Sequence, residues 1–281
     1  MIGKFTKGES PKQILQEVQK GKGLTRLIAG GTEINRLGSS VAADHLISLQ
    51  NLSLNEIRKE GSLISIGAMV TFTEMLESDT IPAYLKEAVR FCGSFTRRNM
   101  ATIGGNIAAD RDDSYLMPTL LSAKARVLLG DISIDGKYNE EDIPLREYLE
   151  FRDHFNDSLI LAVILNRPQR VVLSKRFARS VQSNAAVTVS FGASVEDGTL
   201  SDFRIFAAVK GTGIVRLSHI EEGIANRQFV EPEDVAPSAT QNIAFVDDIT
   251  GSSSYKRYIL GSSVADLYKQ SLSIVENGGD L

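Results

Sequence analysis

The chain has 281 residues, 42% of them hydrophobic, which is enough to bury one large core or two smaller ones. Its 31 basic and 35 acidic residues give a net charge of −4 and form no long run of one sign, which argues against nucleic-acid or anionic-membrane binding. The lack of a membrane-length apolar run and of a signal-peptide pattern favours a cytoplasmic protein. A single cysteine, Cys92, excludes an internal disulfide and a cysteine-ligated iron–sulfur cluster in this chain, and three scattered histidines predict no metal site.

Residues 1–53 predict an alternating β/α unit. Ser10 is a good N-cap for a helix with Pro11 in its first turn, because its hydroxyl accepts a hydrogen bond from a free amide. Apolar strands are expected over residues 24–29 and 45–49.

Residues 54–170 predict a second unit of mixed helix and strand. A hairpin is expected over residues 57–68, and helices are expected after Thr71 and Pro82. The stretch 93–113 has little periodicity and much polar chemistry, which predicts a long loop. Such a loop inside a compact domain is usually functional or disordered, and its apolar content argues against disorder.

The last part of the chain, 171–281, changes character. Alternating apolar residues over 185–191 and 203–209 predict antiparallel strands with one buried face. Helical patterns follow over 214–224 and 264–272. The sequence therefore predicts an α+β fold that ends in a small antiparallel sheet with helices on one face.

Two glycine segments carry the chemical signal. They are Leu27-Ile28-Ala29-Gly30-Gly31-Thr32-Glu33-Ile34-Asn35 and Ala101-Thr102-Ile103-Gly104-Gly105-Asn106-Ile107-Ala108. Glycines leave backbone amides uncovered, and amides beside a threonine hydroxyl can hold an anion. Neither segment matches the dinucleotide fingerprint or the P-loop. Each alone is more often a structural turn, whereas the pair suits the two ends of a diphosphate, so both interpretations stay open.

Both segments resemble motifs of the FAD-binding subunits of the xanthine dehydrogenase and carbon monoxide dehydrogenase family, the molybdenum hydroxylases. That family shows A-G-G-T-D-L near the N-terminus and R-N-x-A-T-I-G-G-N-I near residue 100, which here are residues 29–34 and 98–107. Residues 254–258 are similar to the S-x-Y-R-R segment that opens the family's last helix, so the resemblance covers nearly the whole chain. The Arg-Asp-Asp-Ser-Tyr-Leu segment, residues 111–116, resembles in particular the compact flavin subunits of the YgfM type.

The resemblance implies a domain organisation. An FAD-binding module of the PCMH or vanillyl-alcohol-oxidase-like type would span residues 1–170, in two α+β subdomains of about 1–53 and 54–170. A C-terminal α+β domain of the carbon monoxide dehydrogenase flavoprotein type would span residues 171–281.

The resemblance also implies which residues contact FAD. The first segment would wrap the diphosphate and ribityl chain through Leu27, Ile28, Ala29, Gly30, Gly31, Thr32, Glu33 and Ile34. The second would hold the opposite side through Thr102, Ile103, Gly104, Gly105 and Asn106. Ile160 would form an apolar wall, although a buried strand residue explains it equally well, and Lys175 occupies the position of a lysine near the flavin.

Two positions depart from the family pattern. Tyr115 stands where relatives often have an aspartate that accepts hydrogen bonds from the cofactor, a role that a tyrosine hydroxyl fills only in part. Asp113 is the candidate replacement. Ser183 stands where many relatives carry another aspartate.

The redox chemistry would belong to FAD, so no side chain is predicted to be catalytic. Because the chain has neither iron–sulfur ligands nor a molybdopterin domain, the resemblance implies separate partner chains: a [2Fe-2S] subunit and a molybdopterin subunit. NADH or NADPH would be a further electron partner. Two other functions stay open, a self-contained FAD-dependent reductase or oxidase and a non-redox flavin-binding scaffold. Only the first of these would turn over a nicotinamide nucleotide unaided.

Overall fold

The computed structural model describes residues 2–21, 23–181 and 183–276, which fold into two compact units. Both units are discontinuous in sequence. Unit 1 comprises Met1–Ile81, Ser94–Ala109 and Ala125–Asn166, and unit 2 comprises Pro82–Gly93, Asp110–Lys124 and Arg167–Leu281. Three segments of the predicted first domain, residues 82–93, 110–124 and 167–170, thus belong to unit 2. The division at residue 170 into independently folding domains stays a prediction.

Unit 1 begins with a small parallel sheet in the order β1-β3-β2. Its strands are β1 (Lys4–Lys7), β2 (Thr25–Ile28) and β3 (His45–Ser48). The helical elements are α1 (Pro11–Lys20), α2 (Thr32–Leu37) and the 3-10 turn η1 (Gly38–Ser40). The Ser10 hydroxyl accepts a hydrogen bond from the Gln13 amide at 3.3 Å, which confirms the predicted cap of α1. Strand β1 and the turn η1 were not expected from the sequence.

A five-stranded antiparallel sheet in the order β4-β5-β8-β6-β7 forms the rest of unit 1. Its strands are β4 (Ile57–Glu60), β5 (Leu63–Gly67), β6 (Arg126–Ile132), β7 (Tyr138–Pro144) and β8 (Leu159–Leu165). The accompanying helices are α3 (Phe72–Glu77), α8 (Leu145–Glu150) and η2 (Arg152–Phe155). The predicted hairpin is β4–β5, and Thr71 caps α3 in a capping box with Glu74. One core joins the two sheets, since Ile14 and Leu15 of α1 pack with Leu161 of β8.

The prediction of a long loop over residues 93–113 is wrong. It contains two short helices, α5 (Phe95–Arg98) and α6 (Ile103–Ala109). Ser94 caps α5, and the Thr102 hydroxyl accepts from the Gly105 amide at the start of α6. Both helices are too short to show a helical period in the sequence.

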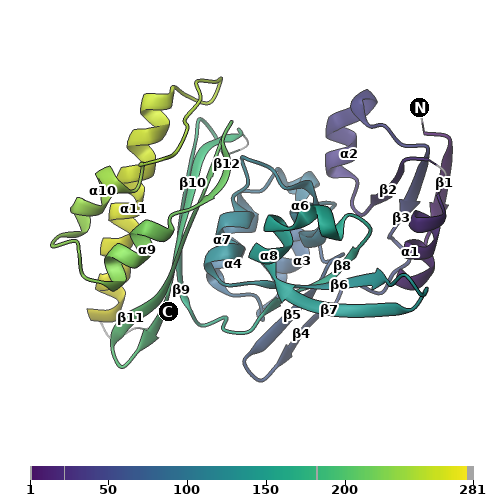
Figure 1. Ribbon diagram of the computed structural model, residues 1–281, viewed down its shortest axis with the longest axis horizontal. Helices are drawn as coiled ribbons and strands as arrows, with labels where there is room; N and C mark the ends of the chain where they lie inside the picture. Colours follow the sequence, from purple (N-terminus) through teal and green to yellow (C-terminus); the bar gives the residue numbers. More distant parts are fainter. Residues whose placement is uncertain (1, 22, 182, 277–281) are drawn as a thin grey trace. The chain divides into compact units, whose positions relative to one another are not determined.

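Unit 2 is built on an antiparallel sheet in the order β12-β11-β10-β9. Its strands are β9 (Val171–Ala178), β10 (Ala185–Glu196), β11 (Thr199–Val209) and β12 (Gly213–Arg216). The later helices are α9 (Ser218–Ala225), η3 (Pro232–Asp234), α10 (Val235–Ser238) and α11 (Ser253–Glu276). Figure 1 shows α9, α10 and α11 on one side of these strands, where they bury side chains such as Val189 and Phe191. The helix predicted over 214–224 is wrong at its start, because residues 213–216 form β12.

The opposite face of this sheet carries small residues. Thr188, Ser190 and Gly192 alternate with the apolar side chains of β10 and face α7 (Leu116–Ser122), which itself packs on α4 (Ala83–Arg90). A Cβ on Gly192 would overlap the Ser122 carbonyl, and the Ser122 hydroxyl donates to the Ser190 carbonyl at 3.0 Å. The sheet is therefore buried on both faces, the second by helices from earlier in the chain.

A buried lysine ties α11 to the turn between β11 and β12. Lys256 is fully buried, and its ammonium group donates to the carbonyls of Lys210 and Val246 at 2.9 and 2.8 Å. The same group pairs with Asp248 at 2.7 Å. Asp112 joins this cluster from the other side, because it accepts from the Gly211 amide at 2.9 Å and pairs with the Lys210 ammonium group.

This cluster predicts a specific acid sensitivity. Desolvation pushes the pKa of Asp248 upward, but hydrogen bonds from Lys256 and Thr250 outweigh it and lower the pKa from 3.8 to about 2. A depressed folded-state pKa means that the carboxylate stabilises the fold above about pH 4 and loses this contribution as the pH falls towards 2. We expect Asp248→Asn to lower the thermal midpoint by a constant amount above pH 5, with a difference from the wild type that shrinks below pH 4. A difference independent of pH would contradict this assignment.

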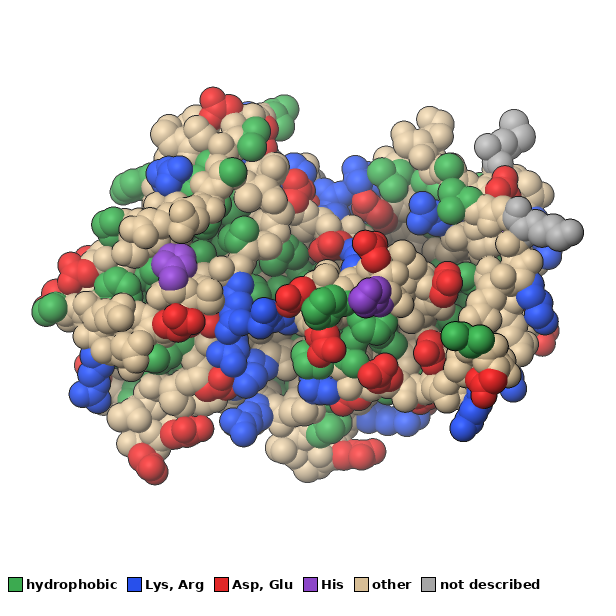
Figure 2. Space-filling model, viewed as in Figure 1, with side chains coloured by type: hydrophobic (Ala, Val, Ile, Leu, Met, Phe, Trp, Pro, Cys, Tyr) green, Lys and Arg blue, Asp and Glu red, His purple; other side chains and the backbone are tan. Residues whose placement is uncertain are grey.

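No helix in the described part of the chain is long and apolar enough to cross a membrane. Figure 2 shows both basic and acidic side chains spread over the visible face. An ion pair joins Lys124 and Asp202 of unit 2 at 2.9 Å.

Candidate functional site

The first glycine segment forms the passage from β2 into α2. Gly31 has φ +71°, a left-handed conformation that favours glycine. The Asn35 amide donates to the Gly31 carbonyl at 2.9 Å as the first helical hydrogen bond. The amides of Thr32 and Ile34 precede that bond and have no intrahelical acceptor. Glu33 is engaged with Arg36 through both carboxylate oxygens.

The second glycine segment is hydrogen-bonded to residues 68–72, which lead from the end of β5 into the first residue of α3. Backbone hydrogen bonds of 3.0 Å run from Phe72 to the Ala101 carbonyl, from Ile103 to the Val70 carbonyl, and from Gly104 to the Ala68 carbonyl. A Cβ on Gly104 would lie 2.7 Å from the Ala68 Cβ, so glycine is needed there for packing. Ala68 in turn donates to Leu161 of β8 at 2.8 Å, which connects the segment to the central strand.

The two segments meet within unit 1. A Cβ on Gly30 would overlap the Met100 carbonyl oxygen, because the backbone of the first segment passes directly against the lead-in to the second. A Cβ on Gly105 would lie 3.8 Å from the Ala29 Cβ. Residues separated by about seventy positions in the sequence therefore form one surface.

The structure corrects the expectation that Gly104 and Gly105 offer uncovered amides. Gly104 donates to Ala68, and Gly105 donates to the Thr102 hydroxyl at 3.1 Å. The group that remains available in this segment is the side chain of Asn106. Its Oδ1 is buried and has no hydrogen-bond partner among the described residues. A buried polar atom without a partner costs free energy, so it marks a place where a ligand donor fits.

The remaining predicted site residues fall into two groups. Ile160 lies in unit 1, where it is 8% exposed and pairs with Leu129 across β8 and β6. Asp113, Tyr115 and Lys175 belong to unit 2.

Within unit 2, these three side chains have partners of their own. Asp113 accepts two hydrogen bonds from Arg111, at 2.8 and 2.7 Å. The Tyr115 hydroxyl lies 3.4 Å from the Ser174 carbonyl, and burial raises the pKa of Tyr115, so it stays protonated. Lys175 pairs with Asp266 of α11. Contact of these three residues with FAD stays a prediction.

Sequence reasoning missed the residues that bring the segments together. Met100 lies inside the second motif, but its side chain gives no hint of its role. The contact with Gly30 is made by the backbone carbonyl of Met100, which every residue type has. Asn99, also in the motif, accepts a hydrogen bond from Thr73 at 2.5 Å. Ala68 was expected only as the last alternating residue of the predicted hairpin. Over the described ranges, no three His, Cys, Asp or Glu side chains gather closely enough to hold a metal ion.

Comparison with known proteins identifies the family to which this chain belongs. The family model of the FAD binding domain in molybdopterin dehydrogenase matches residues 3–168. The chain is 30% identical over 268 residues to YgfM of Escherichia coli K12, an alignment that covers 95% of this chain and 96% of that protein. It is 21% identical over 281 residues to the glyceraldehyde dehydrogenase medium chain of Sulfolobus acidocaldarius, covering 95% and 97%.

A solved structure has the same fold. It is a carbon monoxide dehydrogenase from Hydrogenophaga pseudoflava that lacks the Mo-pyranopterin moiety of its molybdenum cofactor. The TM-score is 0.82 at 20% identity, and the match covers 97% of this chain and 98% of that one.

The fold and the paired glycine segments thus define a flavin-binding protein of the oxidoreductase class. The chain belongs to the family of FAD-binding domains of molybdopterin dehydrogenases. The predicted family, fold class and cofactor are confirmed.

Proposed function

We propose that the chain is the electron-transfer subunit of a molybdenum hydroxylase complex. It passes electrons between bound FAD and a [2Fe-2S] partner subunit, while a separate molybdopterin subunit oxidises the substrate. A nicotinamide nucleotide is the further electron partner. The family and the "medium chain" relative, whose name belongs to an enzyme of several chains, support this assignment. The need for a separate iron–sulfur subunit is supported by the cysteine content, because one cysteine is too few to hold a cluster in this chain.

The observation that carries the proposal is the buried Oδ1 of Asn106, which lacks a partner beside the meeting point of the two glycine segments. FAD supplies ribityl hydroxyl donors for such an acceptor and a diphosphate for the amides of Thr32 and Ile34. The backbone contact of Gly30 with Met100 fixes the two segments in register, so both can hold one extended ligand. Bound FAD supplies the two-electron and one-electron redox chemistry. The protein's own residues bind and orient it.

Asn106→Leu tests the site without disturbing the glycines. An apolar group of similar size removes the partnerless oxygen, so we expect the FAD-free protein to keep its thermal midpoint or gain slightly. The affinity for FAD should fall about tenfold, the equivalent of one lost hydrogen bond. FAD affinity is measured by titration of the deflavinated protein and followed by flavin fluorescence.

Asn99→Leu is the matched contrast in the same motif. Its side-chain oxygen already accepts from Thr73, so its loss should destabilise the FAD-free protein by about 1 kcal/mol. A fall in stability for Asn106→Leu, together with unchanged FAD affinity, would assign Asn106 a structural role and remove the support for this placement of the site.

The electron-transfer role is tested on the FAD-loaded chain alone and in its complex. Anaerobic NADH or NADPH should bleach the flavin absorbance, while steady turnover of the nucleotide should require the iron–sulfur partner. We expect the chain to co-purify with an iron–sulfur chain. We also expect the flavin to pass electrons to that chain. Turnover of substrate by the chain alone would identify a self-contained oxidoreductase, and a flavin that no pyridine nucleotide or partner reduces would identify a scaffold.

A further inference from the structure

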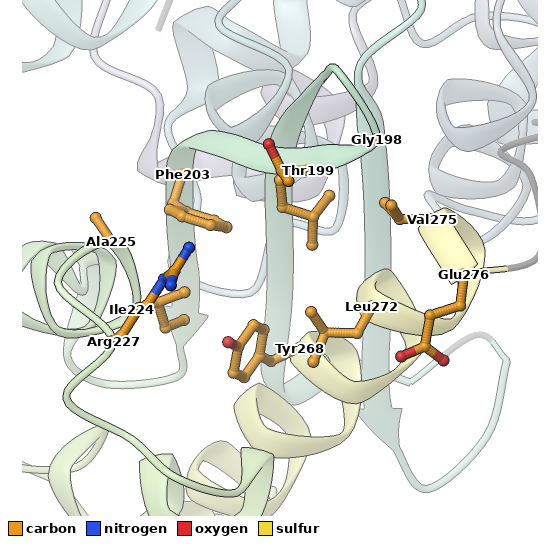
Figure 3. A pocket seen from close by; sticks show the side chains of 11 residues that line it. Gly198, Thr199, Phe203, Ile224, Ala225, Arg227, Tyr268, Leu272, Val275 and Glu276 are labelled. Atoms are coloured by element: carbon orange, nitrogen blue, oxygen red, sulfur yellow. The ribbon is translucent and has the colours of Figure 1, made fainter.

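Unit 2 contains a cavity whose lining includes none of the residues predicted to contact FAD. It has a volume of about 410 Å³ and lies where three segments meet: the hairpin end at Gly198, the end of α9, and the last turns of α11 (Figure 3). A cavity of this size accepts a small organic molecule.

The body of the cavity is apolar. Its wall is formed by Leu200, Phe203, Ile224, Leu272 and Val275. The ring of Tyr268 forms part of the floor and stacks on Phe191, with the ring centroids 5.9 Å apart. Phe191 meets Phe203 edge to face at 6.0 Å. The cavity is therefore an opening of the core of unit 2, and a ligand in it would bury its apolar surface against these rings.

One end of the cavity is polar and cationic. The guanidinium group of Arg227 and the hydroxyl of Tyr268 make no hydrogen bond or ion pair to any residue that the structure describes. Figure 3 shows the Tyr268 hydroxyl directed to the Arg227 end, with Glu276 at the other end. Burial raises the pKa of Tyr268, so its hydroxyl is a donor at neutral pH. Both groups can thus donate to one anion.

The backbone at Arg227 gives a second reason to assign it a role. Helix α9 ends with hydrogen bonds from the Arg227 amide to Ile224 at 3.0 Å and from Gln228 to Gly223 at 2.9 Å, the Schellman pattern. Arg227 occupies its left-handed position with φ +54°, where glycine is the unstrained residue. The helix end does not require a long cationic side chain there.

We propose that this cavity binds a small amphiphilic monocarboxylate. Arg227 and Tyr268 donate to the carboxylate, and the apolar body lies between Leu272 and Phe203. Glu276 at the far end disfavours a second negative charge. The site is independent of FAD and of the proposed electron transfer.

The test is a calorimetric titration of the FAD-loaded protein with sodium decanoate. We expect saturation at one molecule per chain. Arg227→Gln should weaken binding about three- to tenfold, because it removes one charge-assisted hydrogen bond at a partly solvated position. Sebacate, which adds a carboxylate at the far end, should bind at least about tenfold more weakly. Lys12→Gln removes an exposed cation of α1 and should change nothing.

Leu272→Trp fills the cavity and should abolish binding. FAD content and thermal midpoint verify that this variant is folded, and Leu272 is only half-buried, so the larger ring is tolerated. Equal affinity in the wild type and Leu272→Trp would overturn the site, as would the absence of saturable heat. Binding that appears only after deletion of residues 277–281 would mean that the cavity takes the end of the chain itself, and the proposal of a separate ligand would be wrong.

Discussion

Gly30→Ala should destabilise unit 1 and weaken FAD binding together. The added Cβ has no room, because it would overlap the carbonyl oxygen and carbon of Met100, which are backbone atoms that cannot swing aside. Gly30 does not have a positive φ, so steric overlap is the whole penalty. Overpacking of this kind costs about 3 kcal/mol, or roughly 6–12 °C in the thermal midpoint. Separating the two segments should also weaken FAD binding at least about tenfold.

Gly61→Ala is the control for a glycine substitution as such. Gly61 has φ +60° and no atom within 4 Å of an added Cβ, so the cost is the left-handed backbone alone, about 1–2 kcal/mol. Its FAD affinity should equal that of the wild type. If Gly30→Ala loses stability but binds FAD normally, the contact of the two segments is a packing feature and not a requirement of the site.

Lys256→Met should be the most damaging single change in unit 2. Methionine keeps the packing volume but leaves two carbonyl oxygens and the Asp248 carboxylate without their shared donor. Breaking a buried, hydrogen-bonded charge costs about 3–5 kcal/mol. Amide hydrogen exchange should show lost protection at the β11–β12 turn and over residues 244–252, in addition to a lower unfolding midpoint.

Lys269→Met is the control, because Lys269 lies on the same helix as Lys256 but is exposed to solvent. Its ion pair with Glu233 is exposed, with 62% of each side chain accessible. Such a surface pair contributes little to stability, because solvent and salt screen its charges. Equal effects of the two substitutions would show that burial of Lys256 does not carry the stability assigned to it.

The sequence predicted those elements whose signals are local. Ser10 and Thr71 predicted helices because capping is a contact between neighbouring residues. The hairpin over residues 57–68 was predicted from alternation around a turn. The helix start near residue 214 was misplaced because the apolar residues of β12 run straight into those of α9, and their combined spacing imitates one helix.

Features that depend on distant contacts could not be predicted. The close contact of Gly30 with Met100 is a tertiary contact, and no residue type near either position predicts it. The partnerless oxygen of Asn106 became visible only when the amides of Gly104 and Gly105 were found to be engaged elsewhere. The alternation of Thr188, Ser190 and Gly192 indicated an exposed sheet face, whereas α7 covers it.

That covering helix also constrains how the chain is made. Helices α4 and α7 leave the ribosome before any strand of the sheet that buries them, since β9 begins at Val171. All of unit 1 has been synthesised by Asn166. Unit 1 can therefore fold first during synthesis. Apolar side chains of α4 and α7, such as Leu85 and Leu120, then stay exposed to solvent until β9 and β10 have been made. A pause in translation after α4 and α7 have left the exit tunnel, but before β9 and β10 have, would prolong this exposure, and chaperone binding to nascent chains should peak at that length.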